Sequence, residues 1–505
     1  MRPALSLPLL FTLIIGFSGA ESLAAERAPA PPQSKQEVIA ALDSTIPTLM
    51  ARARIPGLGI ALIWDGEVAW EKGYGIKNKN TGEPVDTRTV FEAASLTKPF
   101  FASLAMSLAD SGVIDLDRPL IDYVSQDSIE SAIGHPFTYP GFRADWFRRI
   151  TARMVLSHSS GLPHGQGGKP YPVLFEPGSR FSYSADGYYF LQKVIERRLG
   201  EPLDVTMRKR IIEPLHMDHS AMVWEDRLST DAAVGHSLLG ITSGTPRKHT
   251  EANAAASLYT TAGDYARFIA ALLNGSFPGL RSLDLMFAPQ ISVADSVSWS
   301  LGFGIENTSG GVAFFQWGDY GIFRNYVVAL RGSRRALVYL TNSFFGLAIG
   351  KVLVPLATGI DEDFGLRWLS YAPYDSEVSV FFYAVVERPV EESVHLYHDL
   401  RKKESPATGE DVVNALAYEL LRSGAHDKAL TFFELNIKAF PESANPYDSM
   451  GEACETVGDL PRAAEYYQKA LDALPADSTR SEASKARLRE IVQKSLARVT
   501  EKKPG

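Results

Sequence analysis

Residues 91–100 read FEAASLTKPF, and Ser95 precedes Lys98 by three positions where the chain becomes an apolar helix. In a helix these two positions share a face, with about 5–6 Å between their Cβ atoms, so the Lys98 amine can reach the Ser95 hydroxyl. Partial burial lowers the pKa of a lysine, and the neutral amine can then accept the serine proton. Pro99 is compatible with a helix that begins near Ser95 and points a backbone N–H at a nearby oxyanion.

The S-x-x-K spacing is also typical of an ordinary helix start, in which Ser95 caps the N-terminus and Lys98 faces solvent. A second segment, FEPGSRFSYSADGYYFLQKVIE (175–196), runs from a Pro-Gly turn through an aromatic, strand-like piece into a helix, with Tyr183 in the turn. A tyrosine held near a lysine can act as a general base or acid. The alternative is that Tyr183 is one of 20 tyrosines and packs in a core.

A third segment, FFQWGDYGIF (314–323), is a strand that ends at Trp317-Gly318. Gly318 has no Cβ, so a ligand can approach the backbone closely, and a strand N–H can serve as an oxyanion donor. The alternative is a simple glycine-rich turn.

The order of expected elements predicts an α+β fold. A helix over 35–55 precedes GLGIALIWDGEVAWEKGYG, in which Asp65-Gly66 separates two alternating apolar runs and predicts a hairpin. Residues 95–112 read as a helix and 115–245 as mainly helices and loops. From 297 on, four strand-like runs follow one another across short turns: WSLGFGIE, GVAFFQW, RNYVVALR and RRALVYLTN. We expect these runs and the hairpin to form one antiparallel sheet flanked by helices, with the helical region inserted.

Four segments in this chain order resemble the serine β-lactamase-like family, which includes class C β-lactamases, penicillin-binding proteins and esterases. They are FEAASLTKPFFASLAMSLADSGVIDLDRPLIDYV, ITARMVLSHSSGLP (150–163), FEPGSRFSYSADGYYFLQKVIE and FQWGDYGIF. The resemblance covers about 35–375, and four linked segments make it more specific than S-x-x-K alone.

The resemblance implies a role for each matched residue. Ser95 matches the acylated nucleophile, and Lys98 matches the lysine that helps to activate it. Tyr183 matches the tyrosine of Tyr-x-Asn, the proposed proton shuttle. Gly318 matches the glycine of the His-x-Gly or Lys-Thr-Gly strand, and the backbone N–H groups of Ser95 and Asp319 would form the oxyanion hole.

Two positions depart from the family pattern. Ala185 stands in place of the asparagine of Tyr-x-Asn, and Gln316 stands in place of the strand histidine or lysine. Both usual residues contact the substrate amide or carboxylate, so their absence should weaken binding of a β-lactam or a D-amino-acid carboxylate. Arg324 either supplies a positive charge instead or is a surface arginine.

The N-terminus has a basic residue, an apolar stretch from Leu5 to Phe17 and small residues around Ala20 and Ala24, which together are typical of a signal peptide. We expect 1–24 to be removed and 25–34 to be a flexible lead-in; an uncleaved anchor helix is the alternative. The single cysteine, Cys454, excludes an internal disulfide, and the net charge of −8 disfavours nucleic acid as a partner.

After a connecting segment (376–410), in which FFYAVV is a candidate last strand and RKKESPATGED a polar linker, residues repeat with a period of 34. This is the length of a tetratricopeptide unit, and 411–500 resembles two such units with a further helix as a cap. Six pairs carry the period: Gly424 and Gly458, Ala429 and Ala463, Phe432 and Tyr466, Phe433 and Tyr467, Ala439 and Ala473, Pro441 and Pro475.

The sequence thus predicts an exported, periplasmic or secreted serine hydrolase that acts through an acyl-enzyme. We expect an ester or small peptide as substrate in preference to a β-lactam, no cofactor or metal, and a protein partner on the repeats. A membrane is a partner only if the leader is uncleaved. The first alternative is a non-catalytic protein that binds peptidoglycan fragments; the second makes the repeats the functional part, with the enzyme a localised passenger.

Overall fold

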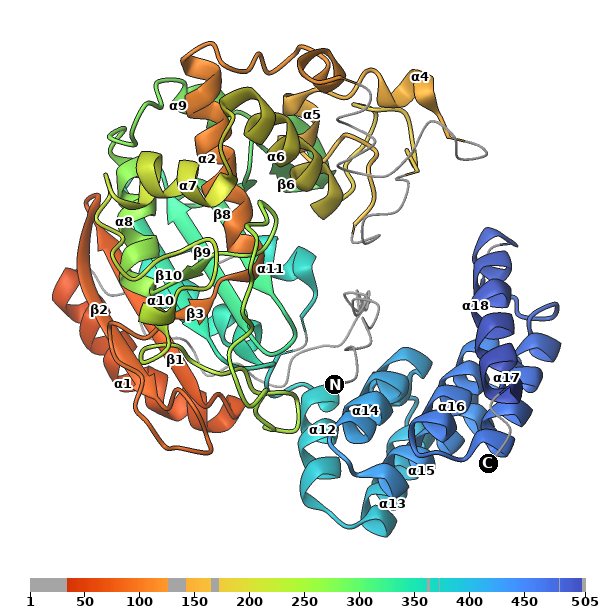
Figure 1. Cartoon of the computed structure of the whole chain (residues 1–505). Coiled ribbons are helices and arrows are strands. Elements are labelled where there is room, and N and C mark those ends of the chain that lie inside the picture. Colours follow the sequence, from red (N-terminus) through yellow and green to blue (C-terminus); the bar gives the residue numbers. More distant parts are fainter. Residues whose placement is uncertain are drawn as a thin grey trace. The chain divides into compact units, whose positions relative to one another are not determined.

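The computed structural model describes residues 34–125, 142–164, 172–360, 364–371, 373–480 and 482–501 (Figure 1). The chain divides into two compact units. One covers Met1–His236 and Thr242–Pro373, and the other covers Ser237–Ile241 and Tyr374–Gly505. The expected leader, 1–24, lies outside the described residues.

An eight-stranded antiparallel sheet forms the frame of the first unit, in the order β2-β1-β10-β9-β8-β7-β6-β5. Pairing of β1 with β10 joins the early hairpin to the late strands, which confirms the predicted α+β fold. The strands are β1 Gly57–Trp64, β2 Glu67–Gly75, β5 Ile291–Ala294, β6 Val297–Trp299, β7 Gly304–Thr308, β8 Gly311–Asp319, β9 Arg324–Leu330 and β10 Arg335–Thr341.

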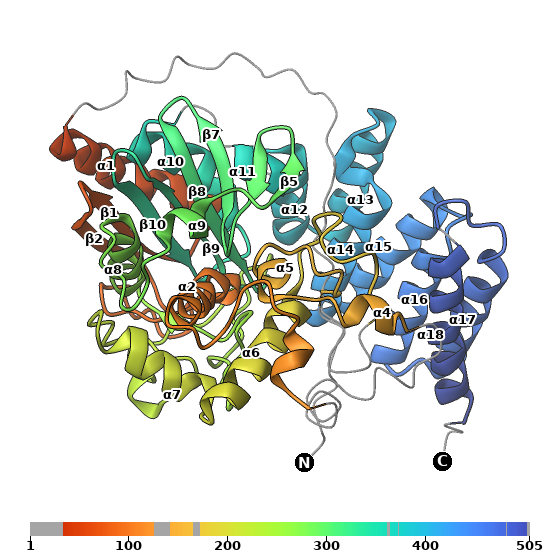
Figure 2. The same ribbon diagram turned by 90° about the horizontal axis from the view of Figure 1, so that it is seen from above.

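The hairpin between β1 and β2 turns at Asp65 and Gly66, with φ angles of 55° and 85°. Two consecutive positive φ values match the twist of the flanking strands, and Asp-Gly adopts them at low cost. Nearly every residue of β1 is buried, because both faces of this inner strand are covered. Helices α1 (Lys35–Ala53) and α10 (Gly350–Thr358) lie on one face, and α8 (Ala262–Leu273) packs on β1, β2 and β10 from the other (Figure 2).

The helical region lies between β2 and β5 in the chain, as predicted. Its central helix, α2 (Thr97–Asp110), is buried on all sides from Thr97 to Leu108 and belongs to the core. The other elements are β3 Phe91–Glu92, η1 Ala94–Leu96, η2 Leu120–Tyr123, α4 Ala144–Phe147, α5 Ala152–Leu156, α6 Ala185–Leu199, α7 Leu203–Met207, η4 Arg208–Ile212, η5 Asp226–Leu228, β4 Tyr259–Thr260 and α9 Leu283–Phe287.

The segment after β10 completes the first unit with the short helices η6 (Gly346–Ile349) and α11 (Phe364–Leu369). The second unit is all-helical. It contains α12 Glu377–Glu387, α13 Val390–Lys402, η7 Pro406–Thr408, α14 Glu410–Arg422, α15 His426–Ala439, α16 Ala444–Thr456, α17 Leu460–Ala473 and α18 Glu482–Glu501. Within the described ranges, none of the helices combines the length and apolar character needed to cross a membrane.

The interpretation of FFYAVV as a strand is wrong, because these residues lie inside α12. The Ser376 side chain caps the helix by accepting from the Ser379 N–H, and the buried positions Val378, Phe381 and Val385 follow a helical period. The polar stretch 401–411 contains the end of α13 and η7, and Ala407 within it is fully buried.

The residues that repeat every 34 positions occupy equivalent places. Gly424 and Gly458 follow α14 and α16 with φ angles of 82° and 88°. In each case the next residue donates its N–H to the carbonyl five positions back, so the same glycine-dependent cap ends both helices. Ala429 and Ala463 are both fully buried where α15 packs on α14 and α17 packs on α16.

Candidate active site

Ser95 lies in a tight turn that joins β3 to α2. The preceding residue, Ala94, has a φ of 50°, a conformation that residues with a Cβ rarely adopt. The turn is held because Ala93 donates its N–H to the Leu258 carbonyl and Thr97 Oγ1 donates to the Ala94 carbonyl. Such strained backbone persists only where its surroundings fix it, and it is frequent at functional sites.

Lys98 points at Ser95. Its Nζ lies 2.9 Å from Ser95 Oγ and donates to the Ala255 carbonyl oxygen at 2.9 Å. The lysine is 1% exposed, so the alternative in which Lys98 faces solvent is wrong. Neither η1 nor α2 has a side-chain N-cap, so the alternative in which Ser95 caps a helix is also wrong.

Burial lowers the pKa of Lys98 from its ordinary value of 10.5 to about 7. The buried carboxylate of Asp186, in the first turn of α6, opposes this shift because it favours the charged amine. A substantial fraction of Lys98 is therefore neutral near pH 7. Sequence reasoning did not identify Asp186, which follows Ala185 at the start of α6.

Tyr183 completes the group, since it immediately precedes Ser184, the N-cap of α6. Its hydroxyl is hydrogen-bonded to Ser95 and accepts from Gln316 Nε2 at 2.8 Å, while Lys98 Nζ lies 4.8 Å from its ring centroid. Burial raises the pKa of Tyr183, and the hydrogen bonds from Ser95 and Gln316 oppose the shift. The tyrosine is therefore protonated at neutral pH, and the structure places it beside Ser95 and not in a remote core.

Gln316 links three parts of the site. Its Nε2 donates to Tyr183 and also lies 3.2 Å from the Ser95 carbonyl oxygen and 3.0 Å from the Trp317 carbonyl oxygen. The residue is fully buried, and its Oε1 has no hydrogen-bond partner among the described residues. Sequence reasoning treated Gln316 as a lost substrate contact, and no local signal in the sequence indicated this structural link.

Gly318 permits a close approach, but the approaching group is the chain itself. A Cβ on Gly318 would lie 2.1 Å from the Ala93 carbonyl oxygen, below any van der Waals distance. The expected approach of a ligand to Gly318 stays a prediction, and the close contact that the structure shows is made by the chain. The glycine brings the end of β8, with Asp319, against the segment that leads into Ser95.

Arg324 is neither a surface residue nor a free cation. Its side chain is 14% exposed, and its Nε donates to Asp319 Oδ1 at 3.2 Å. The guanidinium also donates to the Phe344 carbonyl and lies over the rings of Phe344 and Tyr371. The reading of Arg324 as a surface arginine is therefore wrong, and its positive charge is paired with Asp319.

The His158 ring packs against the Tyr183 ring, with 4.3 Å between the ring centroids. It is fully buried, and its Nδ1 accepts from the Ser184 N–H at 3.0 Å. Burial, together with the nearby Lys98, holds the pKa of His158 well below its usual 6.5, so the imidazole is neutral. His158 belongs to the segment SHSSGLP, but the sequence alone assigned it no role.

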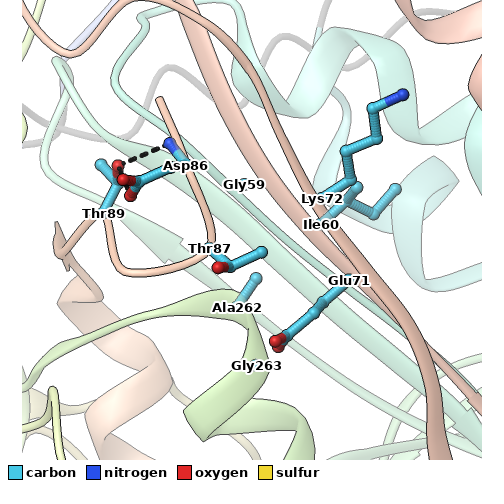
Figure 3. Close-up of a pocket in the computed structure, with 9 residues that line it drawn as sticks. All are labelled: Gly59, Ile60, Glu71, Lys72, Asp86, Thr87, Thr89, Ala262 and Gly263. Carbon is cyan, nitrogen blue, oxygen red and sulfur yellow. Dashed lines mark hydrogen bonds between the residues drawn. The ribbon is translucent and has the colours of Figure 1, made fainter. Parts of the chain in front are cut away.

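A separate small pocket lies between β1, β2, the loop over 86–89 and the start of α8 (Figure 3). Glu71 points toward Gly263, whereas Lys72 points away from the pocket. Asp86 and Thr89 are joined by hydrogen bonds within the loop. The elements that carry Ser95, Lys98, Tyr183 and Gln316 do not line it.

Curated relatives match parts of this chain. Penicillin-binding protein 4 of Amycolatopsis lactamdurans is 28% identical over 207 residues, which cover 37% of this chain and 50% of that protein. An unguisins hydrolase of Aspergillus violaceofuscus is 26% identical over 253 residues, which cover 44% of this chain and 42% of that protein. The chain thus spans about half the length of these relatives.

The fold of this chain is similar to folds of solved structures. A class C β-lactamase structure superposes with a TM-score of 0.54 at 19% identity, covering 65% of this chain and 97% of the other. The family model described as beta-lactamase matches residues 42–356, which include the whole Ser95 site. Because this match covers more than half of the chain, the chain belongs to the beta-lactamase family.

Proposed function

We propose that this protein hydrolyses an ester or small-peptide carbonyl through an acyl-enzyme on Ser95. The observation that carries the proposal is the 2.9 Å contact between Lys98 Nζ and Ser95 Oγ, made by a lysine that burial keeps partly neutral. A neutral amine beside a serine hydroxyl is the arrangement that nucleophilic catalysis requires. A binding protein has no need of it.

In this mechanism the neutral Lys98 amine donates one N–H to Ala255 and accepts the Ser95 proton through its lone pair. Ser95 Oγ then attacks the carbonyl carbon, and the backbone N–H groups of Ser95 and Asp319 stabilise the oxyanion. The leaving group takes a proton through the Tyr183 hydroxyl, which Lys98 replenishes. Water resolves the acyl-enzyme by the reverse sequence of transfers.

The shifts in pKa favour Lys98 over Tyr183 as the base. Burial lowers the pKa of Lys98 to about 7 but raises that of Tyr183 above its ordinary 10. A base is most effective when its pKa lies near the working pH. Tyr183 then acts as a relay whose hydroxyl stays protonated between transfers.

The substrate class follows from two departures. Ala185 has no side-chain amide to contact a substrate, and the Gln316 NH2 group is used by contacts with Ser95, Tyr183 and Trp317. A β-lactam or D-amino-acid carboxylate therefore lacks its usual partners. This favours esters and small peptides over β-lactams.

We further propose that the protein is exported to the periplasm or secreted, on the basis of the leader pattern over 1–24. Intact mass of the exported form tests this, because cleavage after Ala20 or Ala24 gives a chain that begins at Glu21 or Ala25. The 34-residue period and paired helices support a tetratricopeptide module over 411–500 that binds a protein partner. Crosslinking with and without α14–α18 tests this role.

Hydrolysis assays test the catalytic proposal. The substrates are p-nitrophenyl butyrate, D-alanine p-nitroanilide and a chromogenic cephalosporin, each with wild type, Ser95→Ala and the control Ser111→Ala. Ser111 is exposed at the far end of α2. We expect turnover of the ester or anilide that is lost only in Ser95→Ala. A folded protein that binds these compounds without turning any over favours the non-catalytic alternative.

A further inference from the structure

Asp319 fills a site that is built to hold a carboxylate. Its Oδ1 accepts from the Gly321 N–H at 2.6 Å and from Arg324 Nε at 3.2 Å, and its Oδ2 accepts from the Tyr371 hydroxyl at 2.5 Å. A guanidinium, a phenol and a backbone N–H are three donors of the kind that proteins use to bind the carboxylate of a ligand. Here the chain supplies the carboxylate itself.

The donors of this site are held in place by the surrounding residues. The Arg324 guanidinium lies 3.9 Å from the Phe344 ring centroid and 4.8 Å from that of Tyr371, and it also donates to the Phe344 carbonyl. The side chains of Arg324 and Asp319 are only 14% and 19% exposed. The Arg324 Nε–H is therefore already paired with a carboxylate, that of Asp319.

The filled site borders the nucleophile. Asp319 follows Gly318, whose Cα abuts the Ala93 carbonyl two residues before Ser95. Two positions earlier on the same strand, Gln316 contacts the Ser95 carbonyl. The end of β8, where Asp319 and Arg324 face each other, therefore lies beside the segment that carries Ser95.

These contacts place two cations, Lys98 and Arg324, near Ser95, and each already has an interaction partner. Lys98 is directed at Ser95 and the Ala255 carbonyl, and Arg324 is neutralised by Asp319. A substrate carboxylate that arrived at this end would meet the negative charge of Asp319, which already accepts from Gly321, Arg324 and Tyr371. Like charges at close range disfavour the wrong ligand strongly.

We propose that Asp319 is a resident carboxylate that occupies the anion subsite and so selects substrates that are uncharged at this end. This inference rests on the proposed function, because it concerns which ester or amide Ser95 receives. It makes Asp319 a specificity-determining residue through its side chain, separately from its backbone N–H.

The test uses two aryl esters that differ by one charge: the phenylacetylglycyl ester of 3-hydroxybenzoic acid and that of methyl 3-hydroxybenzoate. The readout is the ratio of kcat/KM for the acid to that for the methyl ester. Any change in the oxyanion hole affects both substrates and cancels in this ratio. We expect wild type to prefer the methyl ester, and Asp319→Ala to raise the ratio about tenfold or more, since a charge-assisted hydrogen bond is gained.

Two further variants make the result specific. Asp319→Asn keeps the side-chain shape and removes the charge, so it should raise the ratio several-fold and serves if Asp319→Ala fails to fold. The double variant Asp319→Ala/Arg324→Gln should return the ratio toward the wild-type value, because the cation is gone. A ratio that stays within twofold of wild type in a folded Asp319→Asn would overturn the inference.

Binding without turnover separates this inference from the proposed function. In a Ser95→Ala background, calorimetry compares the corresponding amides of 3-aminobenzoate and its methyl ester. Preference for the acid that appears only with Asp319→Asn supports the resident carboxylate even if neither ester is hydrolysed. If Ser95→Ala and Ser95→Ala/Asp319→Asn show the same preference between the acid and the methyl ester, the inference is rejected, even if Ser95 proves catalytic.

Discussion

Lys98 Nζ and Ser95 Oγ lie 2.9 Å apart, and the lysine that makes this contact is almost completely buried. The two facts belong together, since burial is what lowers the pKa of the amine to about 7. The Asp186 carboxylate opposes this lowering, so the pKa of the Lys98 amine stays close to the working pH. The core position of α2 therefore sets both the geometry and the basicity of the site.

The activity should follow the protonation of Lys98. Since the neutral amine is the base, we expect kcat/KM for p-nitrophenyl butyrate to rise with pH through about 7 and then to level off. Asp186→Asn removes the charge that favours the ammonium, so the midpoint should move to lower pH. A profile that falls as the pH rises through 7 would contradict this assignment.

Lys98 should also make stability depend on pH. The folded protein releases the Lys98 proton near pH 7 and the unfolded chain only near 10.5, so the unfolded state binds more protons between these values. Stability from this group therefore rises with pH across that window. We expect Tm of Lys98→Met to exceed wild type by more at pH 7 than at pH 10. Thermal denaturation of both proteins at pH 7 and pH 10 measures this difference in Tm. The same difference at both pH values would count against a lowered pKa of Lys98.

Tyr183→Phe tests the proton relay. The substitution removes one hydroxyl, while Gln316 Nε2 still has the Ser95 and Trp317 carbonyls to donate to. We expect kcat for an anilide to fall by roughly 10²–10⁴ with little change in KM. The loss should be smaller for a p-nitrophenyl ester, whose leaving group needs no proton. Equal losses for both substrates would remove Tyr183 from the leaving-group step.

Gly318→Ala tests the close packing behind Ser95. The added methyl would lie 2.1 Å from the Ala93 carbonyl oxygen, so the strand or the Ser95 turn must move. We expect a loss of about 1–3 kcal/mol in stability and a marked fall in kcat/KM. Gly332→Ala is the matched control, because a Cβ there meets no atom within 4 Å. Urea denaturation and ester hydrolysis of both variants would show whether Gly318 tolerates the methyl.

Local sequence patterns were sufficient to predict much of the fold. Asp65-Gly66 predicted the hairpin because a two-residue turn depends on adjacent residues alone. Ser95 and Lys98 are likewise neighbours on one helical turn. FFYAVV misled because a short apolar run is compatible with a strand or a buried helix, and the deciding cap at Ser376 lies outside it.

The rest of the site depends on contacts between distant segments. The contact of Gln316 with the Tyr183 hydroxyl spans 133 positions, and that of Tyr371 with Asp319 spans 52. No local period or motif encodes such pairs. The charge of Arg324 was visible in the sequence, but its neutralisation by Asp319 required the β8–β9 hairpin register, in which the two residues face each other.

Covalent labelling of Ser95 tests the central claim most directly. The purified protein is exposed to a fluorophosphonate and, separately, to a penicillin, and its intact mass is measured beside Ser95→Ala and Ser111→Ala. We predict a single fluorophosphonate adduct that is lost only in Ser95→Ala, and weak or no labelling by the penicillin. A folded wild-type protein that acquires no adduct from either reagent would contradict an activated Ser95.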